Sequence, residues 1–590
     1  MFRSSAIQNI QLGLFLILAT VTSFCYAGNY TWNGNTSTAW TTSSNWTPSG
    51  VPGSTDTVTI VTGSRNVYLA ANTSVKQLTM TSGTIDLQTY TLSVSATGMF
   101  TSGQINNGTL SLYGTSTITF KGTTFGAVVS ATGNSILLNG STFNDSLSVV
   151  KKGTAGDNGK GGNTFNGAVS IIDSASGNLV LSDSFPDVFN SRTWVTNRST
   201  GKIYIAHRGT SNQFNGDVTF AGKNIWSNYY GTASYNGNIT FDTPNGEVYF
   251  GYSTGNCSLS SGKNLFIGTN GFSAGFLYLR NFVQSDSTIS VSLTLTGTAK
   301  IAFESGTSIK ANVAASAPFI YLEGTRFLGT CSITTTGSSN ITSLGGSYFA
   351  KATTIFHNPS AACTFTSGST SVDTFASPVI LKNGIGTMSI NNSLFLDSVS
   401  FKNLNSVTGS DRYYVANTGN ARMKGKVVFD NALAGMNFGN SGGTTTLDST
   451  ATTSVVSGFT GNLTLKNFIQ RGSNAVFITM NNNSTKIILN SGTSFDGSFT
   501  YYGQYIQLNG ATFNSTTNIT RYGTSNDISN GGNVFNGTTI LKDSSSHSNN
   551  FYLAYVNPDD YNADVSFIQK GSGVNIYPAY TVENTRKEVH

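Results

Sequence analysis

The chain has 590 residues, of which only 10% are charged and 65 are glycine, and its formal net charge at pH 7 is +6. So small a charge over this length does not favour nucleic-acid binding, and 38% hydrophobic with 12% aromatic residues exclude a disordered chain. Glycine, asparagine, serine and threonine interrupt short runs of β-branched and aromatic residues, which predicts an all-β fold with many turns.

Residues 1–27 have the pattern of a secretory signal peptide. Arg3 lies in a short polar stretch, an apolar run extends from Leu12 to Phe24, and Ala27 offers a small residue for cleavage. The apolar run is too short to span a bilayer, so we expect no transmembrane segment in the mature chain. The sequence therefore predicts a secreted or cell-surface protein.

Three cysteines, Cys257, Cys331 and Cys363, remain after removal of the signal peptide. An odd, small number in so long a chain does not predict a disulfide framework. Two interpretations stay open: three thiols buried in the core, or one disulfide between Cys331 and Cys363.

Residues 28–56 hold three of the five tryptophans, Trp32, Trp40 and Trp46, ahead of the first alternating run at 57–60. The open end of a β-structure pairs readily with other chains, so we interpret this segment as an N-terminal aromatic cap. Flat indole rings also suit sugars, which makes the three tryptophans candidate carbohydrate-stacking residues. The first coils are expected over 57–135.

A long unit is then repeated along the chain. "ILLNGSTF" (136–143) recurs as "IQLNGATF" (506–513), and "IYLEGTRF" begins between them at position 320, so the offsets are 506 − 136 = 370 and 320 − 136 = 184, two periods and one. "GGNTFNG" (161–167) recurs as "GGNVFNG" (531–537) at the same offset, 531 − 161 = 370. We predict repeat unit 1 over 136–319, repeat unit 2 over 320–505, a partial repeat unit 3 over 506–581, and a charged tail over 582–590.

A shorter period lies inside these repeat units. Aromatic residues followed by asparagine occur at Phe143, Phe165, Phe189, Phe214 and Tyr235, in successive steps of 22, 24, 25 and 21. Such steps indicate turns of a β-solenoid, because a coil of short strands satisfies its backbone and buries its apolar face only by stacking on the next coil. We predict a single parallel β-helix of about 20 or more coils.

Alternation within the short runs assigns their faces. In "KIYIAH" (202–207), Ile203 and Ile205 are predicted to face one side and Tyr204 the other.

The repeated phrase is expected to mark the corner of a coil. Its phenylalanine is predicted to point inward, and its asparagine and last glycine to turn the corner with left-handed backbone angles. Stacked asparagines are expected to form amide ladders between coils. These structural markers are Phe165, Asn166, Gly167, Phe535, Asn536 and Gly537.

Three aspartates are spaced like the repeat, each two positions before an aromatic residue: Asp187, Asp373 and Asp559, with 373 − 187 = 186 and 559 − 373 = 186. Catalysis needs one assembled site, whereas these residues recur in every copy, so we assign them a structural role. The loop "GDNGKGGN" (156–163) offers Asp157 for calcium, but the middle copy has Ile341 there, which favours a turn. No catalytic residue, metal ligand or cofactor is predicted.

The opening pattern "WNG…W…NW…VPG…DTVTI", with "FNGDVTF" (214–220) and "YNGNITF" (235–241), resembles a family of repeat-bearing secreted and cell-surface proteins of Bacteroidota and related Gram-negative bacteria. The chain is also similar to the β-helical passenger regions of autotransporter adhesins. The resemblance implies export, surface display and adhesive or scaffold work, and gives no catalytic residues.

An adhesin or structural surface filament is therefore the expected function, with glycans, extracellular matrix or neighbouring cells as partners and weak contacts that add by multivalency. Two alternatives stay open. A β-helix polysaccharide lyase or glycoside hydrolase would need outward acids from neighbouring coils in a groove, and a passive ice- or matrix-binding scaffold would need a flat face of stacked threonines. Candidate ligand patches include Tyr229, Tyr230, Arg280, Tyr501 and Tyr502.

Overall fold

The computed structural model describes the chain from residue 27 onward, and the predicted signal peptide up to residue 26 lies outside the described residues. The other residues outside the description are 62–64, 115, 244, 405–410, 432–433, 457–458, 483–484, 547, 572, 574, 580–584 and 587–590.

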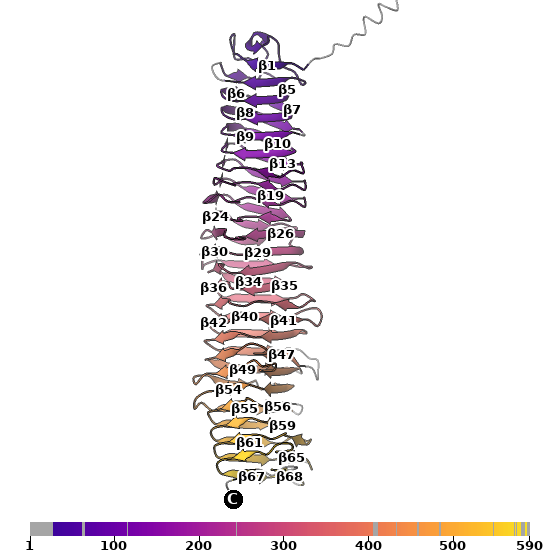
Figure 1. Ribbon diagram of the computed structural model, residues 1–590, viewed down its shortest axis with the longest axis vertical. Helices are drawn as coiled ribbons and strands as arrows, with labels where there is room; N and C mark the ends of the chain where they lie inside the picture. The colour runs from indigo at the N-terminus through magenta and orange to yellow at the C-terminus, as the bar shows by residue number, and fades with distance from the viewer. Residues whose placement is uncertain are drawn as a thin grey trace, which may run out of the picture. The chain divides into compact units, whose positions relative to one another are not determined.

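The described chain forms two compact units. Unit 1 comprises residues up to Arg192 together with Ser199–Gly201, and unit 2 comprises Thr193–Arg198 and residues from Lys202 onward. Short strands of successive coils pair in parallel within each unit (Figure 1), and the coils number about 23 in all. This confirms the predicted all-β parallel β-helix. The boundaries of the sequence repeats remain a prediction.

Helical structure is almost absent from the described residues, where the only helical turn is the 3-10 turn Ser43–Asn45. None of the helical structure that can be described has the length and apolar character required to cross a bilayer.

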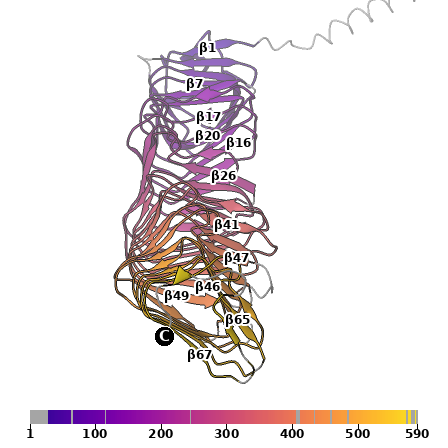
Figure 2. The same ribbon diagram turned by 60° about the horizontal axis from the view of Figure 1, so that its bottom comes forward.

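A typical coil has three short strands, and each of them pairs in parallel with the equivalent strand of the next coil. The parallel pairs are β12–β15, β13–β16 and β14–β17, with the register Phe143 to Phe165, Val149 to Ile171 and Asp157 to Leu179. Alternate residues point inward, so the stacked coils share a continuous apolar core, and Figure 2 shows the turns of each unit lying over one another. The strands of these two coils are β12 (Thr142–Phe143), β13 (Leu147–Lys151), β14 (Asp157–Asn158), β15 (Thr164–Phe165), β16 (Val169–Asp173) and β17 (Leu179–Val180).

The N-terminal aromatic cap is confirmed. Strand β1 (Asn29–Trp32) pairs in parallel with β3 (Thr57–Ile60) and antiparallel with β2 (Trp46–Thr47), so it covers the edge of the first regular strand. The ring centroids of Trp32 and Trp40 lie 4.9 and 4.7 Å from that of Trp46, in edge contacts. The indole of Trp46 donates a hydrogen bond to the Trp40 carbonyl oxygen at 2.8 Å.

At the other end, part of the predicted charged tail continues the coils. Strand β69 (Thr585–Arg586) pairs in parallel with β66 (Asp560–Tyr561). The remaining residues of the tail lie outside the described part of the chain.

The predicted inward phenylalanines form stacked columns. The ring of Phe165 lies 5.4 Å from Phe143 and 4.6 Å from Phe189, nearly parallel to both. All are buried, as predicted. In unit 2 the same arrangement joins Phe327, Phe349, Phe375 and Phe395, and also Phe513, Phe535 and Tyr561.

Asparagine ladders are also confirmed. The side-chain amide of Asn166 donates to the Asn144 oxygen at 2.8 Å, and Asn190 donates to Asn166 at 2.7 Å. Each amide thus links its coil to the coils on both sides. The same ladder in unit 2 joins Asn514, Asn536 and Asn562.

The expected left-handed angles at Asn166 and Gly167 are wrong. Positive φ angles occur earlier in the phrase, at Gly161 and Gly162, with values of 82° and 78°. Gly167 is required for another reason, because a Cβ atom there would lie 2.3 Å from the backbone carbonyl carbon of Asp145 in the neighbouring coil. Gly537 meets Ser515 in the same way, at 2.4 Å. Close stacking of coils therefore requires these glycines.

Replacement of Gly167 by alanine is expected to destabilise unit 1 by about 2 to 3 kcal/mol, because the added methyl group overlaps backbone that cannot rotate away. Gly140→Ala is the control, since Gly140 has a φ of 75° and no neighbour within 4 Å of an added Cβ. Its cost is that of a left-handed backbone alone, about 1 kcal/mol. Urea unfolding of both variants measures the difference, and equal losses would contradict the packing argument.

Candidate functional site

The three repeated aspartates are buried and connect one coil to the next. The Asp187 carboxylate accepts hydrogen bonds from the backbone and side-chain N–H groups of Asn163, at 2.8 and 2.9 Å, and Asp559 accepts the same pair from Asn533. Asp373 accepts from the Ser347 backbone N–H at 2.9 Å. Burial raises the pKa of Asp187 to about 7 and those of Asp373 and Asp559 to about 6. This placement agrees with the structural role inferred from the sequence.

A buried ionic cluster was not anticipated from the sequence. In the last repeat, the guanidinium of Arg521 lies 3.6 Å from Asp527 and 3.5 Å from Asp543, and all three side chains are fully buried. Arg521 also donates to the carbonyl oxygens of Asn550 and Ser525, at 2.8 and 2.6 Å. The corresponding residues are Lys151, Asp157 and Asp173 in the first repeat, and Thr335, Ile341 and His357 in the middle one.

The position of Asp157 supports a structural role in place of the calcium site considered from the sequence. Asp157 is 1% exposed, and its carboxylate accepts a hydrogen bond from the Ile136 backbone N–H at 2.9 Å. Asp527 accepts from Ile506 in the same way, at 3.0 Å. Among the described residues, no group of three or more histidine, cysteine, aspartate or glutamate side chains is arranged to hold a metal ion.

The middle repeat places a histidine and a cysteine together. One ring nitrogen of His357 lies 2.8 Å from the Thr335 hydroxyl, and the other lies 3.9 Å from the Cys363 sulfur. Burial raises the pKa of the Cys363 thiol, which disfavours the thiolate that a nucleophile requires. Cys257, Cys331 and Cys363 are all free and buried, so the Cys331–Cys363 disulfide is excluded.

The most distinctive surface of the molecule is one outward sheet face of unit 2. Residues Ile203, Ile225, Val248 and Leu277 point inward along it. The alternate outward positions carry Tyr204, Trp226, Tyr249 and Tyr278, which are partners in the parallel register. The strands are β20 (Ile203–Tyr204), β23 (Ile225–Trp226), β26 (Asn245–Phe250), β29 (Ala274–Leu279), β32 (Lys300–Glu304) and β35 (Phe319–Glu323).

These four outward rings form a ladder. The Trp226 centroid lies 5.9 Å from that of Tyr204 and 4.2 Å from that of Tyr249, and Tyr278 follows at 4.4 Å from Tyr249. The last three rings are nearly parallel, with interplanar angles of 16° and 10°. Because stacked rings cover each other's faces, the ladder presents ring edges and phenol hydroxyl groups outward.

A second layer of tyrosines covers part of the ladder. Tyr252 contacts Trp226 edge-on at 4.4 Å and stacks on Tyr229 at 5.1 Å, and Tyr230 contacts Tyr229 edge-on at 4.4 Å. Tyr252 is 40% exposed and Tyr230 is 43% exposed, so this layer is accessible. We call the set the aromatic face: Tyr204, Trp226, Tyr229, Tyr230, Tyr249, Tyr252 and Tyr278.

Charged side chains border the aromatic face. The Lys202 ammonium lies 4.4 Å from the Trp226 ring centroid, and that of Lys300 lies 4.4 Å from the Phe276 ring. The Tyr249 hydroxyl donates to the Glu247 carboxylate at 3.3 Å. The face thus combines apolar ring surface with hydrogen-bonding groups of both polarities.

Beside the aromatic face lies a cleft of about 420 Å³. Glu304 and Glu323 are register partners on neighbouring coils, and Arg280 Nε lies 3.9 Å from Glu304 Oε2. Burial raises the pKa of both glutamates. We call this the acidic cleft, and its other lining residues are Ser305, Gly324, Leu344, Gly345, Gly346, Thr370 and Ser371.

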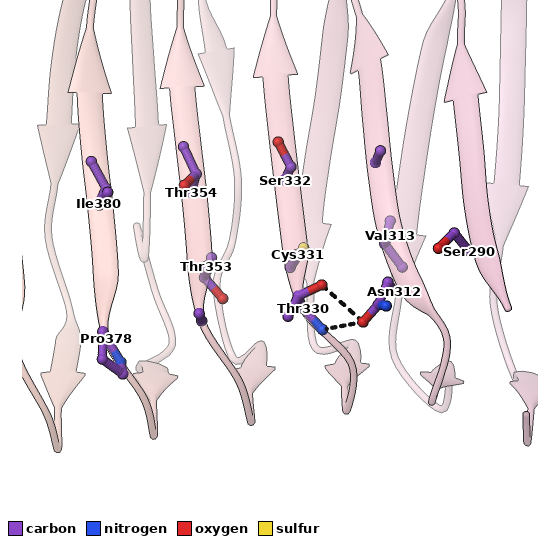
Figure 3. A pocket seen from close by; sticks show the side chains of 12 residues that line it. Ser290, Asn312, Val313, Thr330, Cys331, Ser332, Thr353, Thr354, Pro378 and Ile380 are labelled. Carbon is purple, nitrogen blue, oxygen red and sulfur yellow. Dashed lines mark hydrogen bonds between the residues drawn. The ribbon is translucent and has the colours of Figure 1, made fainter. Parts of the chain in front are cut away.

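A second groove, of about 390 Å³, crosses the outward face of another sheet (Figure 3). Small side chains of β34 (Asn312–Ala317), β37 (Cys331–Thr335) and β40 (Thr353–His357) line it, and no charged or aromatic side chain is among its described lining residues. The Asn312 side-chain oxygen accepts from the backbone N–H and hydroxyl of Thr330, at 3.0 and 2.8 Å. This groove therefore offers hydroxyl groups and small apolar side chains, and no charged or aromatic group among its described lining residues.

An outward column of hydroxyl groups in unit 1 does not have the composition that the ice-binding alternative requires. In-register neighbours on five successive coils are serines, not the threonines that this alternative requires: Ser93, Ser111, Ser130, Ser148 and Ser170.

The residues predicted to form ligand patches lie at different sites in the structure. Tyr229 and Tyr230 belong to the aromatic face, and Arg280 lines the acidic cleft. Tyr502 is 47% exposed, whereas Tyr501 is 1% exposed and donates its hydroxyl hydrogen to the Tyr505 carbonyl oxygen, so its assignment to a surface ligand patch was wrong.

The three capping tryptophans are 1 to 2% exposed, and their ring faces pack in the cap. Sugar stacking on them would require the cap to open.

Sequence reasoning missed most of the ladder and the paired glutamates. A signal was present, because Tyr204, Trp226, Tyr249 and Tyr278 follow each other at intervals of 22, 23 and 29, close to the length of a coil. Comparisons of the chain with protein-family models, curated proteins and solved structures found no match.

Proposed function

We propose that this protein is a secreted or surface-displayed repeat protein that acts as an adhesin or structural surface filament, and that it binds polysaccharides through the aromatic face. The observation that carries the proposal is the two-layer cluster of outward aromatic rings on stacked coils. Tyr230 and Tyr252 are 43% and 40% exposed above Trp226, which is 7% exposed, and clustered rings held at a surface indicate a binding site. The N-terminal signal-peptide pattern supports export.

The chemistry of the face suits carbohydrate. Sugars have apolar C–H surfaces bordered by hydroxyl groups, and the face offers ring surface bordered by phenols, carboxylate and ammonium groups. A further aromatic patch in unit 2, where Tyr502 and Tyr522 lie 4.8 Å apart, provides a second contact area. Several weak contacts on one chain add to a useful avidity when the ligand is a polymer.

Binding of the purified chain to a glycan array tests this proposal. The double variant Tyr230→Ala, Tyr252→Ala is expected to lose about tenfold or more in affinity, since each exposed ring contributes on the order of 1 kcal/mol. Tyr113→Ala is the matched control, because Tyr113 is a comparably exposed tyrosine of unit 1, at 49%. Failure to bind any glycan, or equal binding by the double variant, would contradict the proposed function.

A further inference from the structure

We propose that Arg280, Glu304 and Glu323 form a hydroxyl-binding subsite, and that one neutral polysaccharide chain occupies this subsite and the neighbouring aromatic face together. The inference rests on the proposed function and specifies its ligand class. The three repeats share one fold, so a residue that differs at an equivalent position indicates a role other than folding.

The first and last repeats have asparagine where the middle one has Glu323. Asn139 accepts a hydrogen bond from the Lys160 backbone N–H at 2.7 Å, and Asn509 accepts one from Asn530 at 2.9 Å. The fold therefore uses an asparagine at this corner to satisfy the next coil. The middle repeat has a glutamate, Glu323, at this position in place of the asparagine.

The register partner of this position differs in the same way. The pair is Lys121 with Asn139 across the start of repeat unit 1, and Asn490 with Asn509 across the start of repeat unit 3, where the two amides are hydrogen-bonded at 3.2 Å. Across the start of repeat unit 2 it is Glu304 with Glu323. Like charges directly opposite each other destabilise a sheet, so stability does not account for this pair.

The cleft geometry supplies a reason for the paired carboxylates. Their oxygens accept hydrogen bonds from sugar hydroxyl groups, and the guanidinium of Arg280 donates to ring and hydroxyl oxygens, each with charge-assisted strength. A volume of about 420 Å³ lies in the range of small-ligand sites. The paired carboxylates disfavour a polyanion, and Arg280 offsets part of their attraction for a cation, which leaves a neutral sugar as the best match.

The subsite is continuous with the aromatic face. Tyr278 and Arg280 are two positions apart, and so are Tyr321 and Glu323, so each pair lies on one side of the sheet. The column beside the charged one carries Tyr278, Ala302 and Tyr321 on successive coils. Burial, followed by the negative charge of Glu304, raises the pKa of the Tyr278 phenol to about 12 and keeps it a hydrogen-bond donor. A chain that lies along the aromatic face thus meets the acidic cleft at its side.

Binding of soluble cellohexaose, mannohexaose and xylohexaose by calorimetry tests the inference. We expect at least one of these hexaoses to bind. The double variant Glu304→Gln, Glu323→Gln should bind it about tenfold more weakly. The double variant should melt close to the wild type, because removal of the like-charge contact offsets the loss of the long, partly exposed Arg280–Glu304 ion pair. Lys121→Gln is the control and should bind normally, because Lys121 pairs with Asn139 as Glu304 pairs with Glu323.

The outcomes separate the two proposals. Suppose that the hexaoses bind the wild type, that the double variant Tyr230→Ala, Tyr252→Ala binds them more weakly, and that the double variant Glu304→Gln, Glu323→Gln binds them equally well. The subsite is then wrong, and the aromatic binding function stands. If no glycan binds the wild type, the proposed function itself fails. Tighter binding of oligogalacturonate than of neutral hexaoses would overturn the ligand class. Reducing ends released by the wild type and not by Glu304→Gln would replace the binding role with a hydrolytic one.

Discussion

Replacement of Arg521 by methionine is expected to destabilise unit 2 by about 3 to 5 kcal/mol, the largest loss that we expect from a single substitution. The guanidinium lies among two fully buried carboxylates, 3.6 and 3.5 Å away, and two backbone carbonyl oxygens. Its removal leaves Asp527 and Asp543 in the core without their cation. Hydrogen exchange of peptides spanning 517–552 during urea unfolding measures the loss.

The middle repeat provides the control for this experiment. Its residues at the three positions are Thr335, Ile341 and His357, an uncharged set once the histidine is neutral, and burial lowers the pKa of His357. Installing the same types, as Arg521→Thr with Asp527→Ile and Asp543→His, should therefore cost less than Arg521→Met alone. A triple variant that is less stable than the single one would show that the cluster acts through shape and not through charge balance.

Replacement of Asp187 by asparagine is expected to stabilise unit 1 at pH 8 by roughly 4 kcal/mol. Burial raises the pKa of Asp187 from 3.8 to about 7, a difference of about 3 that corresponds to this energy at about 1.4 kcal/mol for each pKa unit. The folded protein holds the proton more tightly than the unfolded chain does. The stabilisation is therefore complete below pH 3.8 and is lost as the pH rises through about 7.

The wild type should accordingly unfold at lower urea concentration at pH 8 than at pH 5, and Asp187→Asn should remove much of that difference. The asparagine keeps an acceptor oxygen for the two Asn163 N–H groups. Asp145→Asn, at an exposed site of the same unit, is the control and should leave the pH dependence unchanged. Greater stability of the wild type at pH 8 than at pH 5 would contradict the assignment.

The stacked fold was predictable because its strongest determinants are periodic. Phe143, Phe165 and Phe189 recur at the length of a coil, and a ring that must be buried at each turn makes that length visible in the sequence. Ile203 and Ile205 are both buried while Tyr204 is not, as their alternation predicted. The cap was predictable from its concentration of tryptophan.

The ionic cluster and the acidic cleft were not predictable in the same way. Asp527 meets Arg521 only because of where the chain turns between them, and Glu304 faces Glu323 only because β32 and β35 are in register. Composition does not reveal register. Gly167 shows a related limit, since its need for a small residue arises from the backbone of the coil beside it.

The column of phenylalanines has a consequence for how such a gene can change in length. Phe165 stacks on the rings one turn before and one turn after, so an inserted or deleted segment that spans a whole number of turns lets the next ring take the vacated place. Unequal recombination between near-identical stretches produces such segments. Matching phrases such as those at 161–167 and 531–537 are the pattern expected from it, whereas a change of half a turn would bring a small residue, such as Ser176 for Phe165, to the place of a ring.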